Sequence, residues 1–178
     1  MKIGIVNDMP VAVEMMRRVI ASSSKHTVAW TATDGVEALM HCKSDRPDLV
    51  LMDLLMPGMD GVQATRRIMA DSPCPILIVT ATVEGNSTRV FEAMGAGALD
   101  VVQTPTLGGN GAANGIAAFL YKLETTAKLI GENGEPDSAT HEAARTLVAI
   151  GASAGGPAAL AKLLSGLSAD LAASVVIV

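Results

Sequence analysis

Five short apolar runs alternate with segments of helical periodicity over roughly the first 105 residues of the chain. The runs predict strands at Ile3–Asn7, Thr27–Ala32, Asp48–Met52, Ile76–Thr80 and Leu99–Val102. They are nearly continuous in Val, Ile and Leu, which is typical of parallel strands that are covered on both faces. The alternation therefore predicts an α/β fold with a doubly wound, five-stranded parallel sheet.

Apolar positions three and four residues apart predict helices between these strands. Pro10 suits the first turn of the first helix, where its missing N–H costs nothing, and Val11, Met15 and Val19 form the expected buried face. The later helices are marked by Ala38 and Leu39, by Val62, Ile68 and Met69, and by Val90, Phe91 and Met94. A last helix is expected to close one face of the sheet with Ile116, Phe119, Leu120, Leu123, Ala127 and Ile130.

A polar, acidic stretch with Gly, Pro and Ser follows this unit. It predicts a linker over residues 131–145, after a first domain at residues 1–130. Thr146–Ile150 and Ser174–Val178 then predict two strands around a helix at Pro157–Leu167. Because a single βαβ unit cannot bury both faces of its sheet, residues 146–178 are expected to be the incomplete start of a second α/β domain.

Composition narrows the possible functions. The net charge is -5 and aromatic residues make up 2% of the chain, which argues against nucleic acid as a partner. No apolar run reaches membrane-spanning length, so no direct membrane insertion is expected. The two cysteines, Cys42 and Cys74, match no metal-ligand spacing and fit a reduced, cytoplasmic setting, where we expect them to be packing residues. The three histidines, His26, His41 and His141, are expected at the surface.

Acidic and hydroxyl side chains stand at the ends of three predicted strands. Asn7 and Asp8 end the first, Asp53 the third and Thr80 the fourth, and the carboxyl ends of parallel strands form the edge where ligands bind. Two carboxylates suit Mg²⁺, and a carboxylate is also a nucleophile that can form an aspartyl phosphate. Thr80 could donate its hydroxyl to a phosphoryl oxygen. The alternative is that Asp8 and Asp53 are solvated turn residues that cap nearby helices.

A serine stands on a tight turn after the strand at Thr146–Ile150. The segment Gly151-Ala152-Ser153-Ala154-Gly155 matches Gly-x-Ser-x-Gly in the strand–turn–helix context of a nucleophile elbow. Backbone N–H groups at the start of the next helix could stabilise an oxyanion there. The same turn also fits a phosphate-cradling loop, or a small-residue turn without chemistry.

The segments Val6–Pro10, Leu51–Gly61 and Val79-Thr80-Ala81 resemble the signature of response-regulator receiver domains, which have a flavodoxin-like fold. The resemblance implies that Asp53 accepts phosphate from a histidine kinase and that Thr80 is the switch residue. It also implies that Mg²⁺ binds to Asp8, to Asp53 and to the carbonyl of Leu55.

The chain departs from the receiver family at three positions. Asn7 stands where the family usually has a second acid, so the metal site loses one charge. Thr104 precedes Pro105 where the family has a Lys that pairs with the acceptor carboxylate. Val101 stands where many receivers carry an aromatic switch residue.

The chain has a receiver first, then a linker and then the segment Ala149–Pro157. This arrangement resembles the chemotaxis-type receptor methylesterases, the CheB-like response regulators. Lys2–Pro10 and Thr104 are most similar to the Wsp surface-sensing branch. The resemblance implies that Ser153 is the nucleophile that hydrolyses glutamyl methyl esters on the cytoplasmic helices of chemoreceptors. It further implies a CheA-type histidine kinase as partner, deamidation of receptor glutamines by some members, and a receiver that blocks the esterase site until it is phosphorylated.

The serine chemistry needs a general base, and in the family the catalytic His and Asp would follow Val178. The 178-residue chain by itself is therefore expected to lack esterase activity. The alternative function is a non-enzymatic receiver that acts by phosphorylation-dependent protein docking.

Overall fold

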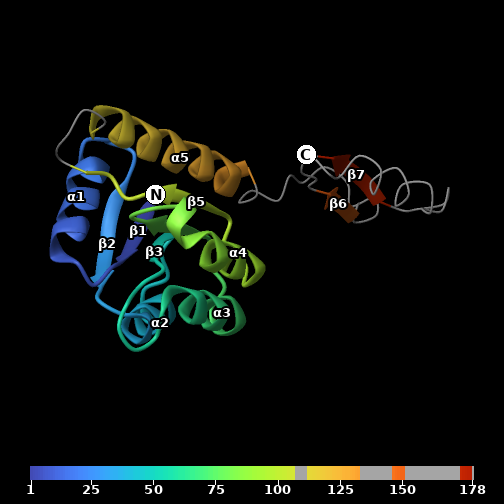
Figure 1. Cartoon of the computed structure of the whole chain (residues 1–178), viewed down its shortest axis with the longest axis horizontal. Helices are drawn as coiled ribbons and strands as arrows, with labels where there is room; N and C mark the ends of the chain where they lie inside the picture. Colours follow the sequence, from blue (N-terminus) through green and yellow to red (C-terminus); the bar gives the residue numbers. More distant parts are fainter. Residues whose placement is uncertain (107–111, 133–145, 151–172, 178) are drawn as a thin grey trace. The chain divides into compact units, whose positions relative to one another are not determined.

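The computed structural model describes residues 1–106, 112–132, 146–150 and 173–177. The chain divides into two units, Met1–Glu135 and Pro136–Val178, and each is described by itself. The first unit contains a five-stranded, all-parallel sheet in the order β2-β1-β3-β4-β5 (Figure 1). This order places β3 at the centre, between β1 and β4, and confirms the predicted doubly wound α/β fold.

The strands lie within one or two residues of their predicted positions. They are β1 (Lys2–Val6), β2 (Thr27–Ala32), β3 (Leu49–Asp53), β4 (Ile76–Thr80) and β5 (Asp100–Gln103). The helices between and after them are α1 (Pro10–Ala21), α2 (Gly35–Ser44), α3 (Gly61–Asp71), α4 (Ser87–Gly95) and α5 (Ala112–Glu132). A short 3₁₀ turn, η1 (Glu84–Asn86), precedes α4.

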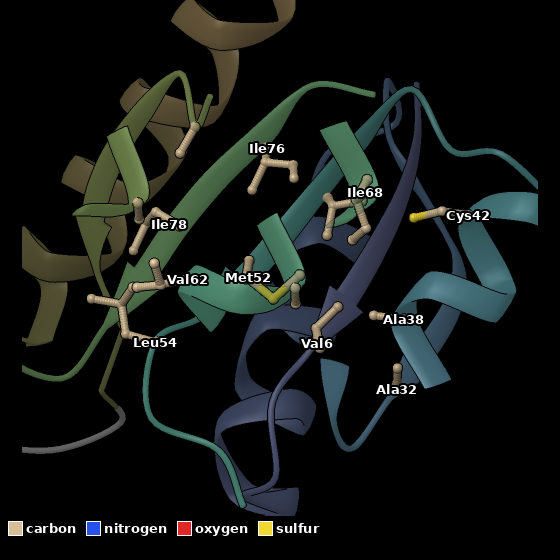
Figure 2. Close-up of a cluster of buried hydrophobic side chains, with 14 of the residues drawn as sticks. Val6, Ala32, Ala38, Cys42, Met52, Leu54, Val62, Ile68, Ile76 and Ile78 are labelled. Carbon is tan, nitrogen blue, oxygen red and sulfur yellow. The ribbon is translucent and has the colours of Figure 1, made fainter. Parts of the chain in front are cut away.

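Alternate residues of each strand point to opposite faces of the sheet and build two cores. Ile3, Ile5 and Leu51 pack with the apolar sides of α1 and α5, where Phe119 and Leu123 are fully buried, as predicted for the closing helix. The opposite face packs against α2, α3 and α4, and Figure 2 shows its strand residues Val6, Met52, Ile76 and Ile78 among helix residues that include Cys42 and Ile68.

One position on α1 departs from the sequence prediction. Met15 and Val19 are buried as expected, whereas the Val11 side chain is 72% exposed. Val11 instead lines a pocket that it shares with Asp8, Asp53 and Thr80 at the ends of the strands. The helical period alone does not show which part of an apolar helix face opens onto a pocket.

Trp30, the one tryptophan of the chain, anchors the edge strand β2. Its indole Nε1 donates to the carbonyl oxygen of Asp45 over 2.9 Å, and its ring stacks on His41 with a centroid separation of 4.9 Å. Gly4 of the neighbouring strand lies against this ring, and a Cβ atom on Gly4 would overlap it. The close fit requires a residue without a side chain at position 4.

His26 corrects another sequence expectation, because it is 6% exposed rather than at the surface. Its Nε2 lies 3.3 Å from Oε1 of Glu124 on α5, and Lys25 Nζ lies 3.4 Å from the other oxygen of that carboxylate. The segment before β2 is thereby tied to the last helix of the unit.

The second unit contains two described strands, β6 (Thr146–Ile150) and β7 (Ala173–Ile177), which pair in parallel with Thr146 opposite Ala173. Both strands were predicted, and their parallel pairing agrees with a βαβ unit. The predicted helix at Pro157–Leu167 lies outside the described residues. No helix in the described part of the chain is long and apolar enough to cross a membrane.

Candidate functional site

The ends of the central strands bring the predicted acidic and hydroxyl side chains together. Asn7 and Asp8 directly follow β1, Asp53 is the last residue of β3, and Thr80 is the last residue of β4. All of them line one pocket of about 450 Å³ at this edge, together with Leu55 and Thr104. The parallel register of the sheet thus assembles the site from segments up to about a hundred residues apart.

Asp53 is held by hydrogen-bond donors on both carboxylate oxygens. Its Oδ1 accepts from the backbone N–H of Leu54 over 2.7 Å and from that of Leu55 over 3.4 Å. Its Oδ2 accepts from Nδ2 of Asn7 over 3.0 Å. Donors around both oxygens favour the ionised carboxylate and restrict its rotation.

The neighbours of Asn7 fix the orientation of its side-chain amide. Its Oδ1 accepts from the backbone N–H of Met9 over 2.8 Å, a position that only the amide oxygen can fill. The nitrogen must then face Asp53, whose ionised oxygen can only accept. Asn7 is 3% exposed, and its backbone N–H donates to Ala32 of β2. Asn7 therefore does more than stand, without a charge, where the receiver family usually has an acid. Its side-chain amide is held in one orientation, in which it donates a hydrogen bond to Asp53.

Opposing effects act on the Asp53 carboxylate. Burial raises the pKa of Asp53 above its ordinary value, the N–H groups of Leu55 and Leu54 oppose this rise, and the negative charge of Asp8 adds to it. Asp53 therefore carries an electrostatic cost that a nearby cation would relieve.

Thr80 is 1% exposed and makes its side-chain contact with Asn86, the last residue of η1. Nδ2 of Asn86 donates to Oγ1 of Thr80 over 2.9 Å and to the carbonyl of Thr82 over 3.0 Å. Because the Thr80 oxygen accepts this bond, its own hydrogen is free to be donated elsewhere. Sequence reasoning missed Asn86, because it lies in an irregular turn whose path gives no periodic signal.

Thr104 lines the pocket on the β5 side, and its backbone N–H donates to the carbonyl of Thr80 over 2.9 Å. Among the described residues, neither Lys nor Arg lines this pocket. The donors to Asp53 are consequently neutral, and the positive charge that the receiver resemblance leads one to expect before Pro105 is missing.

The residues of the pocket fit a small divalent cation. Asp8 and Asp53 supply two carboxylates that repel each other, and Leu55 lines the same pocket. Mg²⁺ is usually bound by one or two carboxylates and keeps several waters. No group of three or more His, Cys, Asp and Glu residues that could hold a metal occurs in the described part of the chain.

Gly61, at the start of α3, packs directly against the backbone of Asp53. A Cβ atom on Gly61 would overlap the carbonyl oxygen of Asp53, and the Gly61 N–H donates to the carbonyl of Leu54 over 3.2 Å. Asp60 caps α3 by accepting from the N–H of Gln63 over 2.9 Å. The turn after β3 is thereby closed tightly behind the Asp53 carboxylate.

Ser153 and the turn from Gly151 to Pro157 lie outside the described residues, and β6 is the described strand that leads to them.

The chain matches two families in separate segments. Residues 3–107 match the response regulator receiver domain, and residues 148–178 match the CheB methylesterase family. Among solved structures, the response regulator domain of Thermotoga maritima CheB superposes with a TM-score of 0.65 at 24% identity, covering 72% of this chain and 96% of that one. A LuxR-family response regulator from Aurantimonas sp. gives a TM-score of 0.57 at 30% identity, covering 75% of this chain and 96% of that one.

Curated relatives match over the whole chain. A protein-glutamate methylesterase/protein-glutamine glutaminase from Pseudomonas fluorescens is 54% identical over 184 residues, and one from Mesorhizobium japonicum is 51% identical over 185 residues. In both cases the match covers 100% of this chain and 55% of the relative. The chain therefore spans about half the length of the curated relatives it matches.

Proposed function

Because the chain belongs to the response regulator receiver family, as a protein of the CheB type, we propose that phosphorylation of Asp53 controls it. The observation that carries the proposal is the shared pocket, in which Asp53 lies with Asp8, Leu55 and Thr80 at the carboxyl edge of the sheet. We divide the protein into a receiver at residues 1–130, a linker at 131–145 and the start of an esterase domain at 146–178.

In the proposed reaction, an oxygen of the Asp53 carboxylate attacks the phosphorus of the phosphodonor. A bond forms between this oxygen and phosphorus, and the bond from phosphorus to the leaving group breaks. With a CheA-type kinase, the leaving group is the imidazole of the phosphorylated histidine. Asn7 and the N–H groups of Leu54 and Leu55 hold the carboxylate in one orientation for this attack.

Mg²⁺ is the proposed cofactor, held by Asp8, Asp53 and the carbonyl of Leu55. When bound, it neutralises the charge that gathers on the phosphoryl oxygens. The two carboxylates of the pocket, and the repulsion between them, support this assignment.

Thr80 is the proposed switch residue. Its hydroxyl hydrogen is free to be donated to a phosphoryl oxygen on Asp53, since its oxygen accepts from Asn86. Asn86 directly precedes α4, so a movement of Thr80 toward the phosphoryl group would act on the start of that helix.

We further propose that the full-length protein is a protein-glutamate methylesterase, with Ser153 as its nucleophile and chemoreceptor cytoplasmic helices as its substrate. Deamidation of receptor glutamines is a second proposed activity. Both are supported by the names of the 51–54% identical relatives and by the match of residues 148–178. Lys2–Pro10 and Thr104 support placement in the Wsp surface-sensing branch, and this assignment implies a cytoplasmic protein.

The test is phosphorylation with acetyl phosphate, a small donor that needs no kinase. We expect Mg²⁺-dependent labelling of the wild type and none of Asp53→Asn. Asp71→Asn is the matched control, because Asp71 is exposed at the far end of α3 and pairs with Lys43. Equal labelling of the wild type and Asp53→Asn, or no labelling of either, would contradict the proposal.

A further inference from the structure

The two cysteines of the chain meet in the core on the side of the sheet away from α1 and α5. Cys42 lies in the last turn of α2, and Cys74 lies between Pro73 and Pro75 just before β4. Their sulfur atoms are 3.8 Å apart, and the two residues are 1% and 2% exposed. Figure 2 shows Cys42 pointing from α2 into the cluster that contains Ile68 and Ile76.

Independent contacts hold the two segments together. Ser72 Oγ donates to the carbonyl oxygen of Cys42 over 3.0 Å, and Lys43 Nζ pairs with Asp71 Oδ2 over 2.8 Å. The end of α2 is thus tied to the end of α3 and to Ser72, close to both thiols in the sequence. The sulfurs are 3.8 Å apart, so a disulfide of about 2.05 Å requires them to move closer together.

We propose that Cys42 and Cys74 are a site of oxidative modification, at which a small hydroperoxide converts the two thiols into an intramolecular disulfide. The disulfide would join the end of α2 to the start of β4, the strand that ends in Thr80. The proposal does not depend on phosphorylation of Asp53.

The reaction balances with one peroxide for each pair of thiols. The Cys74 sulfur attacks one peroxide oxygen, the O–O bond breaks, and the leaving hydroxide takes up a proton as water, which leaves a sulfenic acid. The Cys42 sulfur then attacks the Cys74 sulfur, the S–O bond breaks, and the departing hydroxide takes the Cys42 proton as a second water. The two sulfurs lose two electrons in total, and the peroxide gains them.

The hydrogen bond between the two thiols favours a thiolate on the sulfur that accepts it, and either sulfur can be the donor. With Cys42 as the donor, this bond lowers the pKa of Cys74, although burial opposes this, and the charge of Arg46 lowers it further. The same hydrogen bond, together with burial, raises the pKa of Cys42. With Cys74 as the acceptor, it is the thiol that reacts first, since the thiolate is the nucleophile; with Cys42 as the acceptor, the order is reversed.

Thiol counting after hydrogen peroxide treatment of the folded 178-residue chain tests the proposal. The protein is then unfolded, alkylated with iodoacetamide and analysed at the peptide level, because the ten methionines also take up oxygen. We expect the wild type to lose both alkylation sites, to yield one peptide pair linked through Cys42 and Cys74, and to regain both sites after dithiothreitol. Oxidation should also raise the midpoint of thermal unfolding by about 5 °C or more, since it closes a long loop.

Cys42→Ser and Cys74→Ser are the matched controls, because each keeps one thiol in the same site. In Cys42→Ser, peroxide should give an oxidised Cys74 and no intramolecular link. If the wild type keeps both thiols free while the single thiol of Cys42→Ser is consumed, the sulfurs cannot pair and the proposal is wrong. It is equally wrong if peroxide reaches neither thiol in any of the three proteins, or if the linked peptides come only from different molecules.

Discussion

The side-chain nitrogen of Asn7 lies 3.0 Å from Oδ2 of Asp53 and donates a hydrogen bond to it. This neutral contact occurs in a pocket in which neither Lys nor Arg is found among the described residues. Asn7 therefore positions the carboxylate that we propose to be the phosphoacceptor, a task that a cationic side chain would otherwise perform.

Removal of this donor should slow phosphorylation. For Asn7→Ala at saturating Mg²⁺, we expect the rate of labelling by acetyl phosphate to fall about tenfold. A fall of this size corresponds to the loss of one hydrogen bond to a charged group. Asn7→Asp should bind Mg²⁺ more tightly in a calorimetric titration, because it adds a third carboxylate. Asn114→Ala, an exposed change on α5, is the control. Labelling of Asn7→Ala at the wild-type rate would show that Asn7 is not a positioning residue.

Asn86 should influence phosphorylation only through Thr80. We expect Asn86→Ala to change the lifetime of the phosphorylated protein about fivefold, because the Thr80 hydroxyl loses the donor that orients it. In a Thr80→Val background, Asn86→Ala should have no effect on this lifetime. The wild type, the two single variants and the double variant form a double-mutant cycle that measures the coupling between Asn86 and Thr80. An equal effect of Asn86→Ala in both backgrounds would assign Asn86 a role that does not depend on Thr80.

The buried carboxylate of Asp53 should reduce stability in metal-free buffer. Because burial raises the pKa of Asp53 in the folded protein, the folded chain holds this proton to a higher pH than the unfolded chain does. The contribution of Asp53 to the free energy of unfolding should therefore fall as pH rises from about 4, the unfolded value, through the folded pKa, and then level off.

Asp53→Asn removes this titration and should be more stable than the wild type at pH 7 by about 1 kcal/mol, as is common when a functional charge is removed. Urea unfolding with EDTA at several pH values measures the difference, which should shrink toward acid pH. A constant difference across that range would mean that ionisation of Asp53 is not its cause.

Gly4→Ala should destabilise the fold by about 2–3 kcal/mol, the usual cost of overpacking a core, because its Cβ would overlap the Trp30 ring. Gly95→Ala is the matched control, since a Cβ atom there meets nothing within 4 Å, and it should change stability by less than about 0.5 kcal/mol. Urea unfolding followed by circular dichroism avoids direct use of Trp30 as the probe. Equal stabilities of the two variants would contradict the prediction.

The sequence allowed the meeting of Asp8, Asp53 and Thr80 to be predicted because the geometry of a parallel sheet decides it. Once the strands are recognised, their carboxyl ends must share one edge. The contacts of Asn7 could not be predicted. The sequence shows that Asn7 stands where the family usually has an acid, and so that one charge is lost, but it does not show that the amide donates a hydrogen bond to Asp53.

Contacts that leave no periodic signal in the sequence account for two other departures, at His26 and Asn86. His26 is buried because Glu124, 98 residues further along the chain, lies beside it, and no local pattern records such a partner. Asn86 reaches Thr80 from a short 3₁₀ turn that has no hydrophobic period. Both residues lie in irregular segments, where pattern analysis has no period to use.

The fit between Gly4 and Trp30 has a consequence for how relatives of this chain can differ. A side chain can enter position 4 only when the ring at position 30 has gone, whereas loss of the ring leaves a space that a residue at position 4 can occupy. The two positions should therefore covary, and a lineage that changes one of them first must pass through a weakened intermediate.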